Sequence, residues 1–206
     1  MKKLLIFGLA FGISIGMEAQ NIYDNYVSAS WNYNVPLSSN DFLTQGSGAG
    51  FQIGFRKKID RFYIGADFTY ATYSSQKSRT TFYADNSATT TDTHNFAYSY
   101  GFTVNGEYIF RPFKKLMPFI GLGIGANSIN YWMYYNIYTS KDNGLGGLFR
   151  PQAGILMKLG KESKIAVMGV VHYDYSTAAS TVFGYSSFPA YGFRLGIALN
   201  IPNGIQ

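Results

Sequence analysis

The sequence has no cysteine and few charged residues, and both absences narrow the possible folds and functions. Without cysteine the chain can form no disulfide framework, no cysteine-ligated zinc site and no thiol nucleophile. Charged residues make up 14% of the chain, against about 25% in ordinary globular domains. After residue 19 no apolar run is long enough to cross a bilayer as a helix. The composition is therefore unusual for a soluble domain, and the sequence offers no membrane-spanning helix.

Aromatic residues and glycine are abundant instead. Phe, Trp and Tyr account for 18% of the residues and there are 23 glycines, yet the mean hydropathy is close to zero, at -0.04. A chain that is poor in charge but not apolar overall is expected to interleave apolar and polar positions. Membrane β-barrels have this property because lipid-facing and lumen-facing residues alternate along each strand.

The first nineteen residues are predicted to lie outside the fold. Lys2 and Lys3 form a positive segment, residues 4–16 are apolar but too few to span a bilayer, and Ala19 supplies a small residue at a cleavage point. We interpret residues 1–19 as a signal peptide that is removed on export, and residues 20–206 as one domain. The alternative is a short buried N-terminal helix.

Eight stretches of the remaining chain place an apolar residue at every second position. This period indicates strands rather than helices, and eight is the smallest strand number of bacterial outer-membrane barrels. The stretches are residues 27–35, 48–56, 62–70, 95–110, 120–127, 149–159, 165–175 and 191–201. In the sixth stretch we expect strand pairing to start near or after Pro151, which lacks a backbone donor.

The two faces of these stretches differ in a way that predicts which face meets lipid. In the fifth stretch, for example, Leu122 and Ile124 alternate with Gly121 and Gly123. A soluble barrel would turn its apolar face inward, and its outer surface would carry many lysines and glutamates. Small polar residues suit a narrow lumen better. We therefore predict an all-β, transmembrane, antiparallel up-and-down barrel of about eight strands.

The connections alternate between short and long. The short ones are residues 57–61, 111–117 and 160–163, and the long ones are residues 36–47, 74–94, 128–147 and 176–189. Short periplasmic turns and long external loops are typical of outer-membrane barrels. Most of the lysines and arginines after residue 19 lie in or beside the short connections: Arg56, Lys57, Lys58, Arg61, Arg111, Lys114, Lys115, Lys158, Lys161 and Lys164. A basic cluster can bind nucleic acid, but contact with anionic lipid head groups is the simpler interpretation.

Two segments resemble known barrels. Residues 118–125, Pro-Phe-Ile-Gly-Leu-Gly-Ile-Gly, are similar to a strand common among the small outer-membrane proteins typified by the OmpX, OmpW and OmpA barrels. Residues 194–201 resemble the terminal signal read by the barrel-assembly machinery. The resemblance implies an eight-stranded barrel in the outer membrane of a Gram-negative bacterium, inserted by that machinery and surrounded by outer-membrane lipids and lipopolysaccharide.

Charged residues on the small-residue face form the candidate site. Asp174 lies on a stretch flanked by those that carry Arg150 and Arg194, so its carboxylate is expected to pair with both cations, because buried charges need partners. The full predicted lumenal cluster, with a structural or gating role, is Arg150, Asp174, Arg194, His172, Arg56, Glu107 and Lys158. An eight-stranded lumen is just wide enough for its side chains to fill it, which argues against a wide pore.

The sequence leaves three functions open. The leading hypothesis is a structural or surface-interaction barrel whose external loops contact partners or lipopolysaccharide, with no enzymatic activity, no cofactor and no nucleic-acid partner. The second is a small OmpW-like channel for a small or apolar solute. The third is a lipid A-modifying enzyme, because His172, Asp174 and Ser176 share one face, although a triad is defined by geometry and not by spacing.

Overall fold

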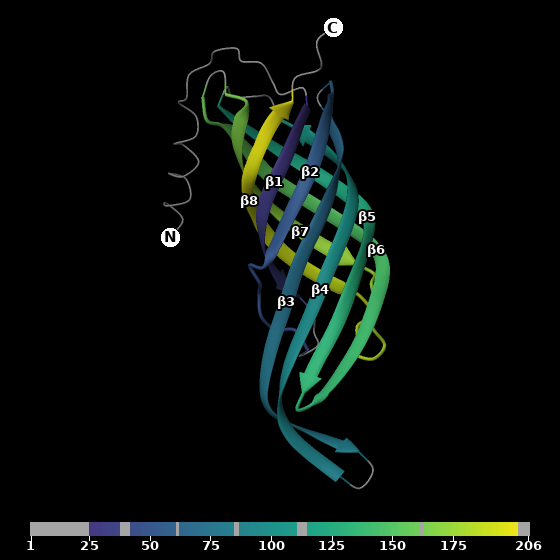
Figure 1. Cartoon of the computed structure of the whole chain (residues 1–206). Coiled ribbons are helices and arrows are strands. Elements are labelled where there is room, and N and C mark those ends of the chain that lie inside the picture. The colour runs from purple at the N-terminus through teal and green to yellow at the C-terminus, as the bar shows by residue number, and fades with distance from the viewer. Residues whose placement is uncertain are drawn as a thin grey trace, which may run out of the picture.

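The computed structural model describes residues 25–37, 42–60, 62–84, 87–110, 115–160 and 163–201, so the predicted signal peptide lies outside the described residues. Eight antiparallel strands form one closed barrel in chain order (Figure 1). The strands are β1 (Asn25–Pro36), β2 (Gly50–Ile59), β3 (Phe62–Ala84), β4 (Ser87–Ile109), β5 (Leu116–Tyr135), β6 (Tyr138–Lys158), β7 (Ile165–Ser176) and β8 (Phe188–Ile201). The prediction of an up-and-down barrel is confirmed.

Closure comes from the pairing of the first strand with the last. The β1–β8 ladder runs from Asn25 opposite Ile201 to Pro36 opposite Ala190. Within the closed part of the barrel each strand therefore has a partner on both sides, which removes the open edges that an isolated sheet would present there. Within the described part of the chain, no helix has the length and apolar character needed to cross a membrane.

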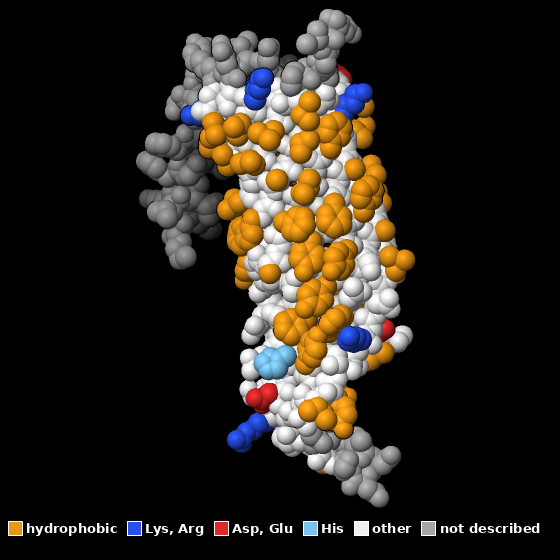
Figure 2. Space-filling view, viewed as in Figure 1, with side chains coloured by type: hydrophobic (Ala, Val, Ile, Leu, Met, Phe, Trp, Pro, Cys, Tyr) orange, Lys and Arg blue, Asp and Glu red, His pale blue; other side chains and the backbone are white. Residues whose placement is uncertain are grey.

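The strands turn their large apolar side chains outward, as the alternation predicts. Ile124 is 60% exposed and Val104 is 57% exposed, although both lie in the middle of strands. The inward positions carry small or polar residues, such as Ser30, Asn32 and Thr103, all of which are buried. In Figure 2 apolar side chains cover the barrel wall between its ends, while the charged side chains gather near the two ends. This arrangement suits a barrel that meets lipid on its outside.

The strand ends that the short connections join all lie at one end of the barrel, which we call the short-turn end (upper end in Figure 1). Of the four long loops predicted at the other end, two are wrong, because the structure has strands there. Residues 74–94 and 128–147 belong largely to β-hairpins, β3–β4 and β5–β6, which extend beyond the other strands. Only Asn136 and Ile137 separate β5 from β6, and Asn136 has a φ of 51°, which asparagine tolerates in a tight turn. Beyond the membrane both faces of a hairpin can be polar or aromatic, so the period of two fades from the sequence.

The prediction that pairing starts near Pro151 is also wrong. β6 begins at Tyr138, and Pro151 lies opposite Leu122 in the continuous β5–β6 ladder. Proline interrupts the pairing on the other side of β6. In the β6–β7 ladder the pair Phe149–Tyr175 is followed directly by the pair Gln152–His172. Proline lacks its backbone donor toward one neighbouring strand only, so the strand continues on the opposite side.

The cations that the sequence places in or beside the short connections fall into two environments. Lys57, Lys115 and Lys164 are exposed at the short-turn end, as expected for contact with head groups. Arg56 and Lys158 are instead buried, because they occupy inward positions of β2 and β6. Arg61, Arg111, Lys114 and Lys161 lie outside the described residues.

Candidate functional site

The inward side chains form three layers along the barrel. An apolar layer lies near the short-turn end, a layer of ion pairs and amides lies in the middle, and a second apolar layer lies at the opposite mouth. The short-turn layer consists of Tyr26, Tyr63, Ile109, Met117, Phe119, Leu156, Ala166, Met168, Val170 and Ala198. The middle layer contains most of the charged residues that the sequence suggested as a site.

Arg56 holds two carboxylates in the middle layer. Its Nη1 lies 2.6 Å from Asp67 Oδ1, and its Nε donates to Glu107 Oε1 at 2.8 Å. The Tyr26 hydroxyl donates to the other oxygen of Glu107 at 2.7 Å. The side chains of Arg56, Asp67 and Glu107 are almost completely buried, so each charge depends on these partners rather than on water.

Glycine on neighbouring inward positions makes room for this ion pair. A Cβ on Gly54 would lie 2.1 Å from Asp67 Oδ1, and a Cβ on Gly65 would lie 1.7 Å from the Phe55 carbonyl oxygen and 2.9 Å from Arg56 Cδ. Any larger residue would therefore displace the carboxylate or the backbone. The small-residue face thus lets long charged side chains fold across a narrow lumen.

Arg150 on β6 forms the second ion pair. Its Nε and Nη2 donate to the two carboxylate oxygens of Asp174 at 2.5 and 2.7 Å. Its Nη1 donates to Thr69 Oγ1 at 2.7 Å and to Gln52 Oε1 at 3.1 Å. A fork-shaped guanidinium matches a carboxylate in this two-bond geometry. Asp174 therefore pairs with Arg150.

Two glutamines connect the ion pairs into one network, and the sequence reasoning missed both. Gln52 accepts from Arg150 and donates to Asp67 Oδ2 at 2.7 Å. Gln152 donates to Glu107 Oε1 at 2.9 Å and accepts from Arg194 Nη2. Both glutamines are buried on inward strand positions. The sequence could have indicated them, because each is a long amide side chain on the small-residue face. A buried amide needs partners for both its donor and its acceptor atoms.

Arg194 is placed differently from the expectation. It is buried, but its hydrogen bond goes to Gln152, and its Nε and Nη1 have no hydrogen-bond partner among the described residues. The expected second ion pair, between Arg194 and Asp174, is not formed. Both carboxylate oxygens of Asp174 accept hydrogen bonds from Arg150. The Arg194 guanidinium donates instead to Gln152, which lies on β6, on the other side of β7.

His172 lies on the lumenal face but does not form a catalytic triad. Its Nε2 is 2.9 Å from Asn34 Oδ1, Asp174 is held by Arg150, and the Ser176 hydroxyl accepts from the Ala178 backbone N–H at 3.2 Å. A triad requires the imidazole to contact both the nucleophile and the acid. Lys158, the last member of the predicted cluster, is buried at the short-turn end of β6, away from the Arg150–Asp174 pair.

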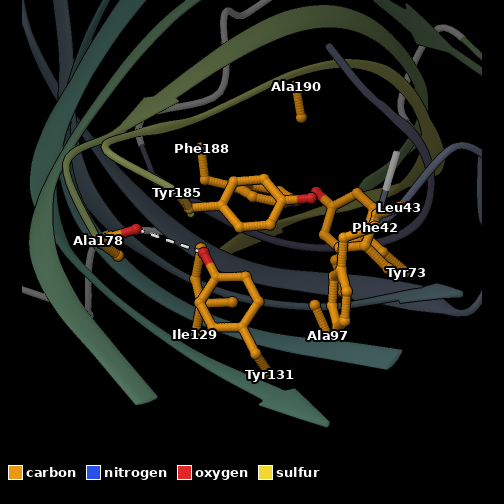
Figure 3. Close-up of a cluster of buried hydrophobic side chains, with 11 residues drawn as sticks. Phe42, Leu43, Tyr73, Ala97, Ile129, Tyr131, Ala178, Tyr185, Phe188 and Ala190 are labelled. Carbon is orange, nitrogen blue, oxygen red and sulfur yellow. Dashed lines mark hydrogen bonds between the residues drawn. The ribbon is translucent and has the colours of Figure 1, made fainter. Parts of the chain in front are cut away.

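The mouth at the hairpin end is filled by an apolar group that the sequence reasoning also missed. We call it the mouth cluster, and it consists of Phe42, Leu43, Ala71, Tyr73, Ala97, Ile129, Tyr131, Ala178, Tyr185, Phe188 and Ala190. Figure 3 shows Tyr185 and Phe188 facing Phe42 and Tyr131 inside the barrel wall. Tyr131 stacks on Tyr185 at 5.2 Å between ring centres, and its hydroxyl donates to the Ala178 carbonyl at 3.3 Å. The sequence could have indicated this cluster, because apolar residues occur within the otherwise polar β1–β2 and β7–β8 connections.

A side-chain contact at the hairpin end holds one of these connections in place. Ser180 donates to Asp142 Oδ2 at 2.5 Å, which ties the connection between β7 and β8 to the β5–β6 hairpin. This hydrogen bond, together with bonds from the Asn143 and Val182 backbone N–H groups, lowers the pKa of the Asp142 carboxyl below its ordinary value.

Four aromatic rings form a patch on the outward face of β4 and β5. Phe96 contacts Tyr98 and Tyr134 at ring-centre distances of 6.3 and 6.0 Å, and Trp132 contacts Tyr98 and Tyr134 at 5.8 and 6.0 Å. The ammonium group of Lys141, on the adjacent strand β6, lies 4.1 Å from the centre of the Trp132 ring. The patch continues the outward apolar face toward the hairpin end.

Comparison with solved structures identifies the fold. No protein-family model and no curated protein sequence matches the chain. The crystal structure of Neisserial surface protein A superimposes with a TM-score of 0.52 and 13% identity, over 89% of this chain and 100% of the other. Ail, the attachment invasion locus protein of Yersinia pestis, superimposes with a TM-score of 0.53 and 12% identity, over 86% and 99% of the two chains. The fold is that of the eight-stranded outer-membrane β-barrels.

With this fold, the chain has an interior that its own side chains fill. Tyr131 and Ile129 in the mouth cluster are 0% exposed, and Tyr63 and Phe119 in the short-turn layer are 2% exposed. Water therefore reaches these side chains neither from outside nor from within the lumen. Between the two layers, the ion pairs lie in a low-dielectric space, where each depends on an intact partner.

Proposed function

We propose that the protein is a structural and surface-interaction protein of the outer membrane, with a closed lumen and an external sheet that meets partners. The observation that carries this proposal is the pair of buried apolar layers, one at each end of the lumen. A water-filled pathway needs polar groups or open space along its whole length, and both ends here are packed with apolar side chains. The middle network then serves to hold the strands together.

The proposed interaction surface is the part of the barrel that extends beyond the other strands. β2 pairs with β3 only as far as Gly50 opposite Ala71, with one further bridge between Gln45 and Ser74. β4 pairs with β5 only from Thr93 onward. Beyond these points the β3–β4 hairpin is a two-stranded ribbon, and in the described part of the chain neither β2 nor β5 covers its outer edges. Such edges can accept an extended segment of another protein as an added strand.

The outward aromatic patch supports contact with lipopolysaccharide. Its rings and Lys141 lie at the hairpin end of the apolar face, where the aromatic girdle of a barrel adjoins the lipid head groups. Aromatic faces can stack on sugar rings, and a cation complements the phosphate groups of the headgroup. We infer that outer-leaflet lipopolysaccharide covers this patch.

A narrow gated conduit is the second candidate, and one observation favours it. Four members of the mouth cluster, namely Phe42, Leu43, Ala178 and Tyr185, belong to connections between strands and not to the barrel wall. Connections can move without breaking the barrel ladders, so displacement of these segments would open the mouth. We do not propose catalysis, because His172, Asp174 and Ser176 are each bonded to other groups.

Location and assembly follow the same proposal. We propose that residues 1–19 direct export, that the barrel-assembly machinery inserts the chain into the outer membrane of a Gram-negative bacterium, and that residues 194–201 carry the assembly signal. In support of this, these residues lie in β8, the strand that closes the barrel against β1. No nucleic-acid partner and no cofactor form part of the proposal.

Planar-bilayer recording tests the closed lumen. The purified wild-type barrel, shown to be folded by its faster migration before boiling, should give no stable conductance. A variant in which Tyr185→Ala and Phe188→Ala weaken the mouth cluster should remain closed, because the short-turn layer is intact. Steady ion conductance by the wild type would contradict the structural role. Conductance by the double variant alone would favour the gated conduit.

The interaction surface needs a separate test. Replacing residues 77–92 by a two-residue turn removes the ribbon but leaves the barrel ladders. The shortened protein should fractionate with the outer membrane as the wild type does, while cells that carry it lose binding to whatever surface the wild type binds. Recovery of the wild-type protein as a soluble periplasmic species would contradict the proposed location, and unchanged surface binding by the shortened protein would contradict the role of the ribbon.

A further inference from the structure

The lipid-facing surface has a groove in its short-turn half. The groove has a volume of about 590 Å³ and crosses the outside of β5, β6, β7 and β8. Its walls are large apolar side chains: Phe110, Ile120, Ile155, Val171, Phe193 and Leu195. Most of the outward surface is covered by side chains of this size, so a depression of this volume requires a local cause.

The cause is two small residues at outward positions of adjacent strands. Ala153 on β6 and Gly169 on β7 line the groove, and in the β6–β7 ladder Ala153 lies opposite Val171 while Gly169 lies opposite Ile155. A Cβ on Gly169 would approach only Leu195 Cδ2, at 3.8 Å, so the space above it is not filled by neighbouring side chains. The depression therefore follows from the sequence at these two positions.

Two exposed lysines lie at the short-turn end of the strands that line the groove. Lys115 is exposed, and its carbonyl accepts from the Lys158 backbone N–H at 3.0 Å, which places it beside the end of β6. Lys164 is exposed, and its carbonyl accepts from the Asn200 backbone N–H at 2.7 Å, which places it beside the end of β8. Of the described carboxylates, only Asp60 lies outside the lumen at this end, and it belongs to the β2–β3 turn across the barrel.

We propose that this groove is a binding site for one anionic phospholipid of the inner leaflet. An acyl chain fills the depression over Ala153 and Gly169, and the phosphate group lies between Lys115 and Lys164. The occupant is a lipid and not a second copy of the chain, because the cations complement an anionic headgroup at the level where head groups lie. The apolar walls supply the burial that favours the chain.

Native mass spectrometry tests the proposal with the full-length barrel. The protein is reconstituted in bilayers of phosphatidylethanolamine with a minor fraction of phosphatidylglycerol and is then released into detergent. The wild type should retain one phosphatidylglycerol molecule in preference to phosphatidylethanolamine. Gly169→Leu, which fills the groove, should lower the retained fraction several-fold, and Ala153→Leu provides a second variant should the first fail to fold.

Gly106→Leu is the matched control. Gly106 is also outward and has no atom within 4 Å of an added Cβ, but it lies on β4, outside the groove lining. It should retain the lipid as the wild type does. A Lys115→Gln/Lys164→Gln variant should lose the preference for phosphatidylglycerol. Equal retention by wild type and Gly169→Leu, equal loss in Gly106→Leu, or a wild type without preference between the two lipids would overturn the proposal.

Discussion

Removing the Asp174 carboxylate tests whether the lumenal network stabilises the barrel. In Asp174→Ala, Arg150 loses both of the bonds that it makes to a carboxylate, at 2.5 and 2.7 Å. The guanidinium stays where it is, because its Nη1 still donates to Gln52 and Thr69. The variant therefore leaves a buried positive charge without its counter-charge.

The size of the effect follows from the burial of the two partners. Breaking a buried pair by removing one partner costs about 3–5 kcal/mol of unfolding free energy. The Arg150 side chain is 2% exposed and that of Asp174 is 16% exposed, so the carboxylate is less completely buried than its partner. We therefore expect the lower end of the range, about 3 kcal/mol.

A double-mutant cycle in lipid vesicles separates the ion pair from general damage. Urea unfolding, followed by tryptophan fluorescence and by the shift in gel migration on boiling, gives the free energy of each variant. Arg150→Met combined with Asp174→Ala removes both charges and should recover much of the loss, because no uncompensated charge remains. His172→Ala, which removes one neutral contact to Asn34, should cost only about 1–2 kcal/mol.

Two results would refute this reasoning. If Asp174→Ala unfolds within about 0.5 kcal/mol of the wild type, the change is no larger than that of an ordinary surface substitution, and the pair does not stabilise the barrel. If the effects of Arg150→Met and Asp174→Ala simply add, the two side chains are energetically independent, which their hydrogen bonds contradict.

Two further predictions concern the outer surface and the external connection. Ile124→Arg places a cation on the lipid face near the middle of β5 and should destabilise the vesicle-inserted barrel by about 2–4 kcal/mol, whereas equal stability would contradict the outward facing of Ile124. Hydrogen bonding in the folded state lowers the pKa of Asp142, so this bond stabilises the fold above the ordinary carboxyl pKa and is lost as pH falls through the lowered value. Protease cleavage within residues 177–187 should therefore increase in strongly acidic buffer, and Asp142→Asn should show that increase at neutral pH; cleavage that does not depend on pH would contradict it.

The barrel itself could be predicted from the sequence because the membrane imposes one rule on every spanning strand. Lipid on one side and a narrow lumen on the other force apolar and small residues to alternate, as Ile124 and Gly123 do. Outside the membrane this rule ends. Residues 74–94 and 128–147 were predicted as loops because the contrast between an apolar face and a small-residue face, which marks the other strands, fades in both segments.

The lumen could be predicted only in part, for a different physical reason. The period of two indicates that Arg56, Glu107, Arg150 and Asp174 point inward, but it does not indicate which of them meet. Partners are set by the height of each residue in the barrel and by the reach of its side chain, as Arg194 shows by bonding to Gln152. The mouth cluster was missed because four of its members lie in connections with no periodic pattern, namely Phe42, Leu43, Ala178 and Tyr185.

The cross-lumen bonds also bear on how the chain reaches its folded state. Arg150 meets Gln52 across 98 positions of the chain, and Tyr26 meets Glu107 across 81. Neither contact joins neighbouring strands, so neither can form in a hairpin or an open sheet, and both wait for the barrel to close. A one-residue slip of β2 or β6 against its neighbours would turn Arg56 or Arg150 toward the hydrocarbon. The lumenal charges thus penalise a barrel in which either of these strands is misaligned.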